Sequence, residues 1–123
     1  MRVPILKQEN FLIASVQSAL SDVEWERLRD DLADQVGRHR SYGVIVDISA
    51  LDVLDSFATR TLRSIAYILS LRGAKTVVVG MQPDVAYSMV RLGLSLEHIE
   101  TGLDLEDGLM ILRESLKGGA GPV

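Results

Sequence analysis

The stretch "VIVDISALDVLDSFATRTL", Val44 to Leu62, decides the fold class because it opens as a buried strand and closes as a helix. Its apolar run ends at Asp47, and a similar run, "TVVVG", follows the helix. Strands that are apolar on both faces are typical of a sheet covered on both sides, or of a largely parallel central sheet. An apolar stripe at helical spacing predicts that the helix extends from about Ser56 to Leu71. The stripe consists of Ala58, Leu62, Ile65 and Leu69.

The segments before this stretch predict two strands and one helix. "VPILK" and "FLIASV" read as short strands with a turn at Asn10 between them. "SDVEWERLRDDLADQVG" predicts a helix that begins in a capping box of Ser21 and Glu24 and can end at Gly37. Its apolar face consists of Trp25, Leu28, Leu32 and Val36.

The segments after the stretch predict two further helices with a short strand between them. "QPDVAYSMVRLG" favours a helix with Pro83 in its first turn and Gly93 at its end. A short strand is expected near Ile99, and a final helix from about Leu105 to Leu116, with Asp104 as its cap. The apolar face of this last helix consists of Leu105, Leu109, Leu112 and Leu116.

The resulting order, β-β-α-β-α-β-α-β-α, predicts an α/β fold with a mixed, mostly parallel sheet and about four helices. Right-handed crossovers place the loop after Asp47 at the C-terminal edge of the sheet, where α/β proteins usually have their sites. A length of 123 residues fits one domain. We expect that domain to span residues 1–117 and residues 118–123 to form a flexible tail.

Composition excludes several classes of function. The formal net charge of -4, from 13 basic and 17 acidic residues, argues against a general nucleic-acid binder. The absence of cysteine excludes disulfides, thiolate catalysis and cysteine-ligated metals. No apolar run approaches the roughly 20 residues that span a bilayer, and "MRVPILKQEN" lacks the apolar core of a signal peptide. We therefore expect a cytoplasmic protein that binds neither nucleic acid nor a membrane.

The motifs of common enzymes are missing, so we expect no catalysis and no cofactor. Neither His39 nor His98 has a metal-binding partner at a recognisable spacing, and there is no dinucleotide or phosphate-loop motif. Asp47, Asp52 and Asp55 could bind a cation or act as acid and base. A receiver domain with a phosphorylated aspartate would need a second acidic pair and a differently placed lysine, which this sequence does not have.

Ser56, at the start of the predicted helix, allows two interpretations. In the first, Asp55 or Ser56 caps the helix and nothing more happens. In the second, Ser56 takes up a phosphate, which a helix N-terminus tolerates because its N–H groups are unpaired. The phosphate would lie beside Asp47, Asp52 and Asp55 and would change the charge that a docked partner meets. Both interpretations are compatible if Asp55 caps the helix and Ser56 occupies the first helical position.

The same residues resemble the STAS-domain proteins of the bacterial stressosome, of the RsbS type. The resemblance covers about Val3 to Leu116 and depends on a strand that ends in Asp47, followed by four motifs in order. These are "VLDSF", "RGAKTVVVG", "QPDVAYSMVRLG" and "ETGLDLEDGL". The order of the set is more specific than any one motif. It implies a STAS fold and a role without enzymatic activity.

The resemblance also implies partners and a site. Such proteins self-associate, as dimers within a large particle, and co-assemble with RsbR-type STAS paralogues that carry sensory domains. The particle sequesters an RsbT-type serine kinase, which phosphorylates the STAS proteins on stress and leaves, and an RsbX-type phosphatase resets the system. Ser56 corresponds to the phosphoacceptor, and no sensory domain accompanies it, so the chain should relay a signal. Candidate partner-binding residues, chosen by proximity to Ser56, are Asp47, Asp52, Asp55, Phe57, Thr59 and Arg60.

The residues at the helix start bear on the alternative function, a free anti-anti-sigma factor that binds an anti-sigma factor kinase. Those proteins typically read Asp-Ser-Ser-Gly at this helix start, whereas Asp55 and Ser56 are followed here by Phe57 and Ala58. The difference favours the stressosome branch. A third alternative, from another class, is a small hydrolase that uses Ser56 as its nucleophile.

Overall fold

The computed structural model describes residues 3–97 and 99–120. Within these ranges the predicted element order is confirmed. The strands are β1 (Ile5–Gln8), β2 (Phe11–Ser15), β3 (Gly43–Asp47), β4 (Lys75–Val79) and β5 (Glu100–Gly102). The helices are α1 (Asp22–His39), α2 (Ser56–Leu71), α3 (Pro83–Leu92) and α4 (Leu105–Ala120).

The strands form one mixed sheet in the order β1-β2-β3-β4-β5. β1 pairs antiparallel with β2, and each later pair is parallel. In this register Ser15, Asp47, Val79 and Gly102 lie in one row across four strands. The parallel strands therefore end at a common edge, and the predicted α/β class with a mostly parallel sheet is confirmed.

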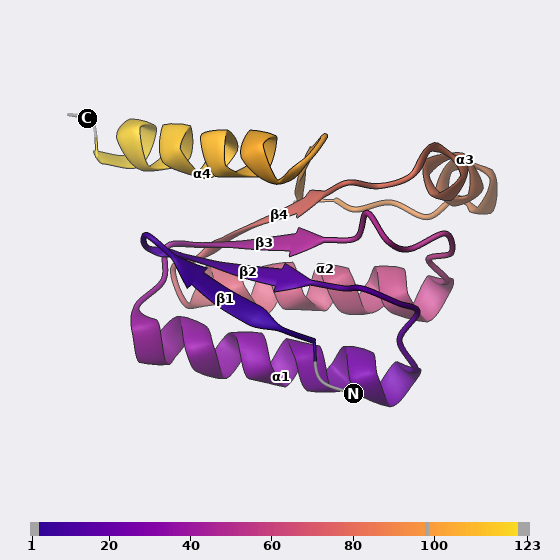
Figure 1. Cartoon of the computed structure of the whole chain (residues 1–123), viewed down its shortest axis with the longest axis horizontal. Coiled ribbons are helices and arrows are strands. Elements are labelled where there is room, and N and C mark those ends of the chain that lie inside the picture. The colour runs from indigo at the N-terminus through magenta and orange to yellow at the C-terminus, as the bar shows by residue number, and fades with distance from the viewer. Residues whose placement is uncertain (1–2, 98, 121–123) are drawn as a thin grey trace.

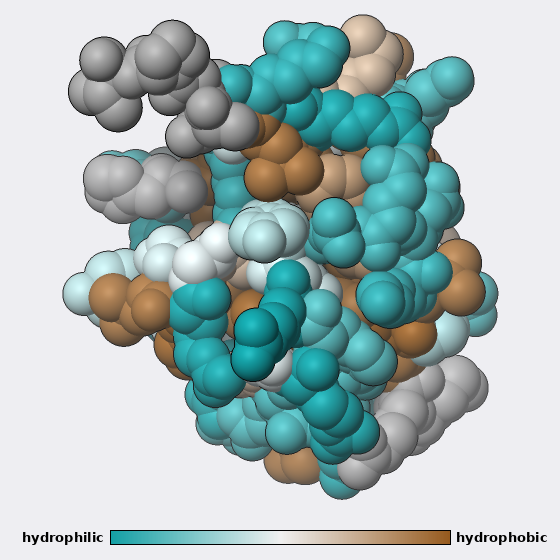
Figure 2. Space-filling model, turned by 90° about the vertical axis from the view of Figure 1, so that its left-hand side faces the viewer, coloured by the Kyte–Doolittle hydropathy of each residue, from teal (hydrophilic) through white to brown (hydrophobic). Residues whose placement is uncertain are grey.

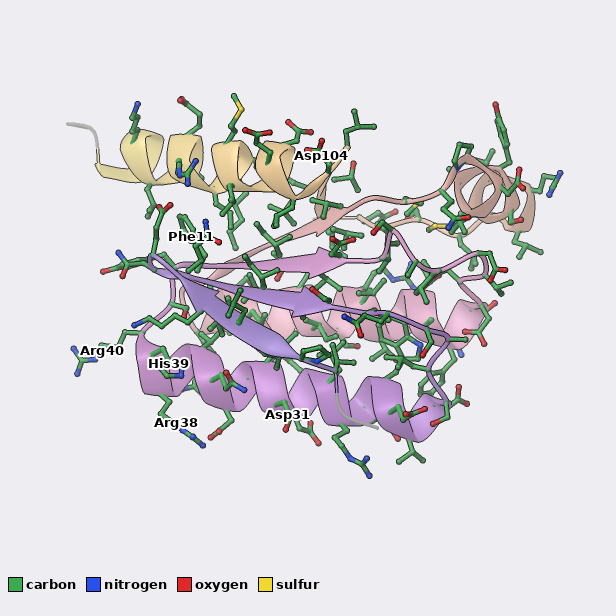
Figure 3. All side chains as sticks on the ribbon, viewed as in Figure 1. Phe11, Asp31, Arg38, His39, Arg40 and Asp104 are labelled. Carbon is green, nitrogen blue, oxygen red and sulfur yellow. The ribbon has the colours of Figure 1, made fainter. Side chains whose placement is uncertain are left out.

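The helices cover both faces of the sheet (Figure 1). α1 and α2 lie against one face, α4 lies against the other, and α3 lies beyond the C-terminal ends of the strands. Alternate residues of β3 point to opposite sides, so that Val44 and Val46 join the larger apolar cluster while Ile45 joins the smaller one under α4. Figure 3 shows Phe11, a member of the smaller cluster, between the sheet and α4.

α1 begins as predicted but ends later than predicted. The Ser21 hydroxyl accepts a hydrogen bond from the Glu24 backbone N–H at 3.2 Å, and the Glu24 carboxylate accepts one from the Ser21 backbone N–H at 2.9 Å. The prediction of an end at Gly37 is wrong, because the helix continues to His39 and the left-handed residue that closes it is Arg40, with φ of 51°. Gly37 has another role, since a Cβ there would lie 2.1 Å from Nη2 of Arg72.

The C-terminal helices follow the predictions with two differences. Pro83 is the first residue of α3 and Gly93 its left-handed cap, as predicted. In α4 the Asp104 carboxylate accepts a hydrogen bond from the Asp107 backbone N–H at 2.9 Å, which confirms the predicted cap. Leu109 and Leu112 are buried, Leu105 is half-buried, and Leu116 is 37% exposed because the helix has passed the end of the apolar cluster.

α4 also continues to Ala120, into the segment for which we expect a flexible tail. Glycine lowers helix stability but keeps its N–H donor, so the two glycines before Ala120 do not stop a helix that is already formed. The rest of the expected tail, residues 121–123, lies outside the described residues. In the part of the chain that the structure describes, no helix is long and apolar enough to cross a membrane.

Candidate functional site

The loop after β3 has a fixed shape because its polar groups are bonded and its apolar side chains are buried. The Asp47 carboxylate accepts a hydrogen bond from the Ser49 backbone N–H at 2.9 Å, and the Asp47 carbonyl accepts one from the Val16 backbone N–H at 3.0 Å. Leu51 and Leu54 are 2% and 5% exposed. These anchors lead the chain from the common edge of the sheet to the start of α2.

The loop after β4 supports the loop after β3 from the side. Gly80 adopts a φ of 79°, and a Cβ at that position would lie 2.7 Å from the Cβ of Ser49. The Gln82 side-chain amide donates a hydrogen bond to the Ser49 carbonyl at 2.9 Å. Our sequence reasoning missed both residues, although a glycine directly after an apolar strand is a signal for a close approach of two backbones.

At the start of α2, the structure confirms a cap and places Ser56 directly after it. Asp55 is the N-cap, and its carboxylate accepts a hydrogen bond from the Ala58 backbone N–H at 2.8 Å. Ser56 is the first helical residue and is exposed. Among the described residues, no hydrogen bond engages the Ser56 hydroxyl. Asp55 therefore caps the helix through one N–H group, and the Ser56 hydroxyl stays unbonded and exposed.

Thr59 does not belong to an accessible surface, and its prediction as a partner-binding residue is wrong. It is 0% exposed, and its hydroxyl donates to the Asp55 carbonyl at 2.9 Å. Thr61 is 6% exposed and donates to the Phe57 carbonyl at 2.9 Å. Because α2 packs this side of its first two turns on the core, neither hydroxyl is available without local unwinding.

The accessible residues around the hydroxyl form what we call the Ser56 surface: Asp52, Val53, Asp55, Ser56 and Arg60, all of which are exposed. Val53 is 66% exposed, and our sequence reasoning missed it because an isolated apolar residue in a loop gives no periodic signal. Two other predicted residues lie at its margin. Asp47 is half-buried and held in its turn, and the half-buried Phe57 packs against the larger apolar cluster.

Among the described residues, no histidine lies near Ser56 to activate it as a nucleophile. His39 lies at the C-terminal end of α1, at the opposite edge of the sheet from the start of α2 (Figure 3). His98 lies outside the described residues. Across residues 3–97 and 99–120, no group of three His, Cys, Asp or Glu could hold a metal ion, so the three aspartates do not form a cation site there.

Comparison with known proteins bears on the fold and the family of the chain. A model of the STAS domain family matches residues 2–108 of the chain. Over 106 residues the chain is 26% identical to the RsbT co-antagonist protein RsbRA of Bacillus subtilis (strain 168). The match covers 86% of this chain and 39% of RsbRA. The chain therefore spans about two fifths of the length of that curated relative.

Two solved structures are similar over nearly their whole length. One is a serine-to-glutamate variant of RsbS from Moorella thermoacetica, with a TM-score of 0.81, 32% identity, and coverage of 95% of this chain and 99% of that chain. The other belongs to a structure of the stressosome, described as a signal integration and transduction hub. Its TM-score is 0.64 and its identity 31%, and the match covers 93% of this chain and 99% of that chain. These similarities confirm the predicted fold class and the resemblance found in the sequence.

Proposed function

The chain belongs to the STAS domain family as a stressosome-type member related to RsbS and RsbR proteins, and from this premise we propose that it sequesters an RsbT-type serine kinase. Phosphorylation of Ser56 by that kinase then releases it. RsbRA, which is named as a co-antagonist of RsbT, supports the choice of kinase. The single observation that carries the proposal is the exposed, unbonded hydroxyl of Ser56 at the first position of α2.

The position of Ser56 makes phosphorylation compatible with the fold. The first N–H groups of a helix have no partner within it, and the helix dipole places partial positive charge there. Asp55 uses only the Ala58 N–H, so other donors of the first turn remain for phosphate oxygens. A phosphate on Ser56 is therefore accommodated without unfolding α2.

The charge around Ser56 makes phosphorylation effective as a release signal. Asp52 and Asp55 are exposed on the same surface, and Asp47 is half-buried at its margin. A phosphate adds about two negative charges to these carboxylates. A partner docked on Val53 and Arg60 then meets added repulsion from its own acidic groups and a phosphate in the place of a small hydroxyl.

In this proposal the chain contributes an acceptor and a docking surface, and the chemistry of transfer belongs to the kinase with its ATP and Mg²⁺. The chain works within a particle, together with RsbR-type paralogues and further copies of itself, and an RsbX-type phosphatase reverses the modification. The similarity to a chain of the solved stressosome supports the particle. A role as a non-enzymatic relay follows.

The test uses the purified chain, an RsbT-type kinase and ATP, followed by intact and peptide mass spectrometry. We expect one phosphate, on Ser56, and none in Ser56→Ala. Ser49→Ala is the matched control, because Ser49 is a second exposed serine at the same edge of the sheet. Phosphate on another residue, or full modification of Ser56→Ala, would contradict the proposal.

Release is tested separately by the amount of kinase that immobilised chain retains. We expect Ser56→Asp to retain less kinase than the wild-type chain and Ser49→Asp to retain as much, because only the first places charge at the helix start. Equal retention by all three proteins defeats the electrostatic mechanism. Light scattering of a mixture with an RsbR-type partner distinguishes the particle from the free anti-anti-sigma factor, which would stay small.

A further inference from the structure

The edge of the sheet opposite the Ser56 surface carries a hollow of about 390 Å³ where α1 and α2 end. We call it the arginine hollow, and its lining includes Gly37, Arg40, Ser41, Tyr42, Arg72 and Gly73. The lining residues include two arginines and no acidic residue. Figure 2 looks onto this end of the molecule, where hydrophilic residues cover most of the surface, and Figure 3 shows Arg40 at the end of α1.

Both arginines of the hollow lack a partner. Arg40 closes α1 and Arg72 closes α2, and within the described ranges no ion pair or side-chain hydrogen bond engages either guanidinium. Arg38, two residues before Arg40, is different because it pairs with Asp34. The Arg72 guanidinium lies against Gly37 in the wall of the hollow, and the Arg40 side chain extends from its rim toward solvent (Figure 3). Among the described residues, no carboxylate compensates either charge.

A buried hydroxyl in the same wall is also unsatisfied. Ser41 is 3% exposed, and its Oγ has no hydrogen-bond partner among the residues that the structure describes. A buried hydroxyl without a partner is unfavourable, and most such groups in folded proteins are bonded. An acceptor oxygen that enters the hollow would give this hydroxyl a partner once the serine side chain turns toward it.

The position of Arg72 depends on a glycine inside a helix. Gly37 lies in the last turns of α1, where alanine would favour the helix more. A Cβ at Gly37 would lie 2.1 Å from Nη2 and 3.0 Å from Cζ of Arg72. The glycine thus permits the guanidinium to lie across the end of α1, beside Arg40 and Ser41 in the wall of the hollow.

We propose that the arginine hollow binds a phosphate-type oxyanion through the guanidinium group of Arg72. The Arg40 guanidinium and the Ser41 hydroxyl are further donors once these side chains turn into the hollow. Each helix C-terminus contributes a partial charge of roughly −0.5, so the two full charges of the arginines outweigh both ends together. Guanidinium groups bind such anions through paired N–H donors. The anion is inorganic phosphate or the phosphate group of a small phosphorylated molecule, because both present the same oxygens. This site is independent of phosphorylation at Ser56.

Titration of the folded chain with inorganic phosphate, followed by NMR of the backbone amides and compared with chloride at equal ionic strength, tests the proposal. We expect saturable shifts confined to the residues that line the arginine hollow. A second titration with phenyl phosphate separates the two sources of the anion. Tighter binding than inorganic phosphate, with larger shifts at Tyr42, assigns a phosphorylated molecule, and equal binding assigns free phosphate.

Three variants decide whether the arginines hold the anion. Arg72→Gln should weaken binding about tenfold or more, since a hydrogen bond to a charged group accounts for at least that factor. Gly37→Ala should weaken binding while the helix stays folded, because it displaces the guanidinium without removing it. Arg27→Gln, which changes an exposed arginine in the N-terminal half of α1, should bind as the wild-type chain does.

The proposal is overturned by shifts that never saturate, by shifts scattered over helix N-termini, or by undiminished binding in both Arg72→Gln and Gly37→Ala. The amide spectrum of each variant shows whether it is folded. If Arg72→Gln does not fold, Arg40→Gln takes its place, because Arg40 is exposed and its side chain is bonded to no other described residue.

Discussion

Ser56 and Thr59 carry the same functional group one helical turn apart, but only one of the two hydroxyls is open to another protein. At Thr59 the carbonyl four residues earlier, that of Asp55, already faces along the helix and accepts the hydroxyl at 2.9 Å. At Ser56 the carbonyl four residues earlier belongs to Asp52, which lies in the loop before the helix. The first helical position therefore leaves a serine hydroxyl without the local partner that binds it one turn later.

This difference predicts the behaviour of a Thr59→Val chain. Valine has nearly the shape of threonine, and the Asp55 carbonyl keeps its hydrogen bond from the Thr59 backbone N–H at 3.0 Å. We expect the free energy of unfolding to change by about 1 kcal/mol or less, since one hydrogen bond has a net value of this order. Urea unfolding measures this change.

In the kinase assay, intact mass should show the same incorporation of phosphate into Thr59→Val as into the wild-type chain. A loss of one phosphate in Thr59→Val would mean that α2 unwinds in the kinase complex and that Thr59 is an acceptor. That outcome would contradict the assignment of Ser56 as the only phosphorylated residue of the chain.

At the residue scale, the sequence predicted what depends on local geometry. The exposed Ser56 and the capping Asp55 follow from the rules for helix starts, and the structure confirms both. Thr59 was misassigned because we chose it by distance along the chain from Ser56. Its place on the buried side could have been read from the spacing that it shares with Leu62, Ala66 and Leu69.

At the element scale, the capping box of α1 gives a second prediction. Ser21→Ala removes the hydroxyl that accepts from the Glu24 backbone N–H, and we expect it to lower the free energy of unfolding by about 1 kcal/mol. Ser18→Ala is the control, because Ser18 is an exposed loop serine just before the helix. Thermal or urea unfolding of the two variants compares them, and equal stability of both would show that the cap has no net effect.

The same cap predicts how stability depends on pH. The hydrogen bond from the Ser21 backbone N–H holds the pKa of Glu24 below its ordinary value of 4.5. The folded chain thus binds this proton less readily than the unfolded chain does, so the stabilisation is present above the ordinary value and is lost as pH falls through the folded pKa.

Glu24→Gln provides the measurement, because glutamine cannot titrate. The stability difference between the wild-type chain and Glu24→Gln should be largest at neutral pH and should shrink as the pH falls below 4.5. Urea midpoints across that range record the difference. A difference that stays constant with pH would show that the carboxylate is not bonded to the cap in solution.

The end of α1 could not be predicted from its own sequence. Glycine is the usual residue after a helix, so Gly37 looked like a stop. Its actual role depends on Arg72, which follows from the packing of α1 against α2 and not from any local pattern. Arg40 therefore takes the left-handed position that a glycine usually fills.

At the scale of the whole molecule, the two proposed sites lie at opposite edges of the sheet because α1 and α2 each run back across it from the strand that precedes them. The helix start at Ser56 lies at the C-terminal edge with Asp47, Asp52 and Asp55 near it, while Arg40 and Arg72 close helices at the other edge. A net charge of -4 does not reveal this separation. The element order, together with the handedness of the crossovers, does predict it.

The sheet also divides the core into two apolar clusters, one covered by three helices and the other by a single described helix. This difference gives the last prediction. α1, α2 and α3 contribute to the larger cluster, whereas α4 is the only described helix with residues in the smaller one. Leu112 is 1% exposed, and it packs so closely on the sheet that a Cβ at Gly43 would lie 2.7 Å from its Cδ2. Leu112→Ala should therefore lower the free energy of unfolding by about 2–5 kcal/mol, a large part of the roughly 5–15 kcal/mol of a typical domain.

Leu116→Ala is the matched comparison on the same helix, because Leu116 is 37% exposed, and we expect it to change stability by less than about 1 kcal/mol. Urea unfolding gives both values, and hydrogen exchange of the α4 amides shows whether the helix opens before the rest of the molecule. In Leu112→Ala we expect faster exchange in α4 than in β3, because the larger cluster does not depend on that leucine. Equal losses of stability in the two variants would contradict the packing of α4 described above, since only one of the two leucines lies within the core.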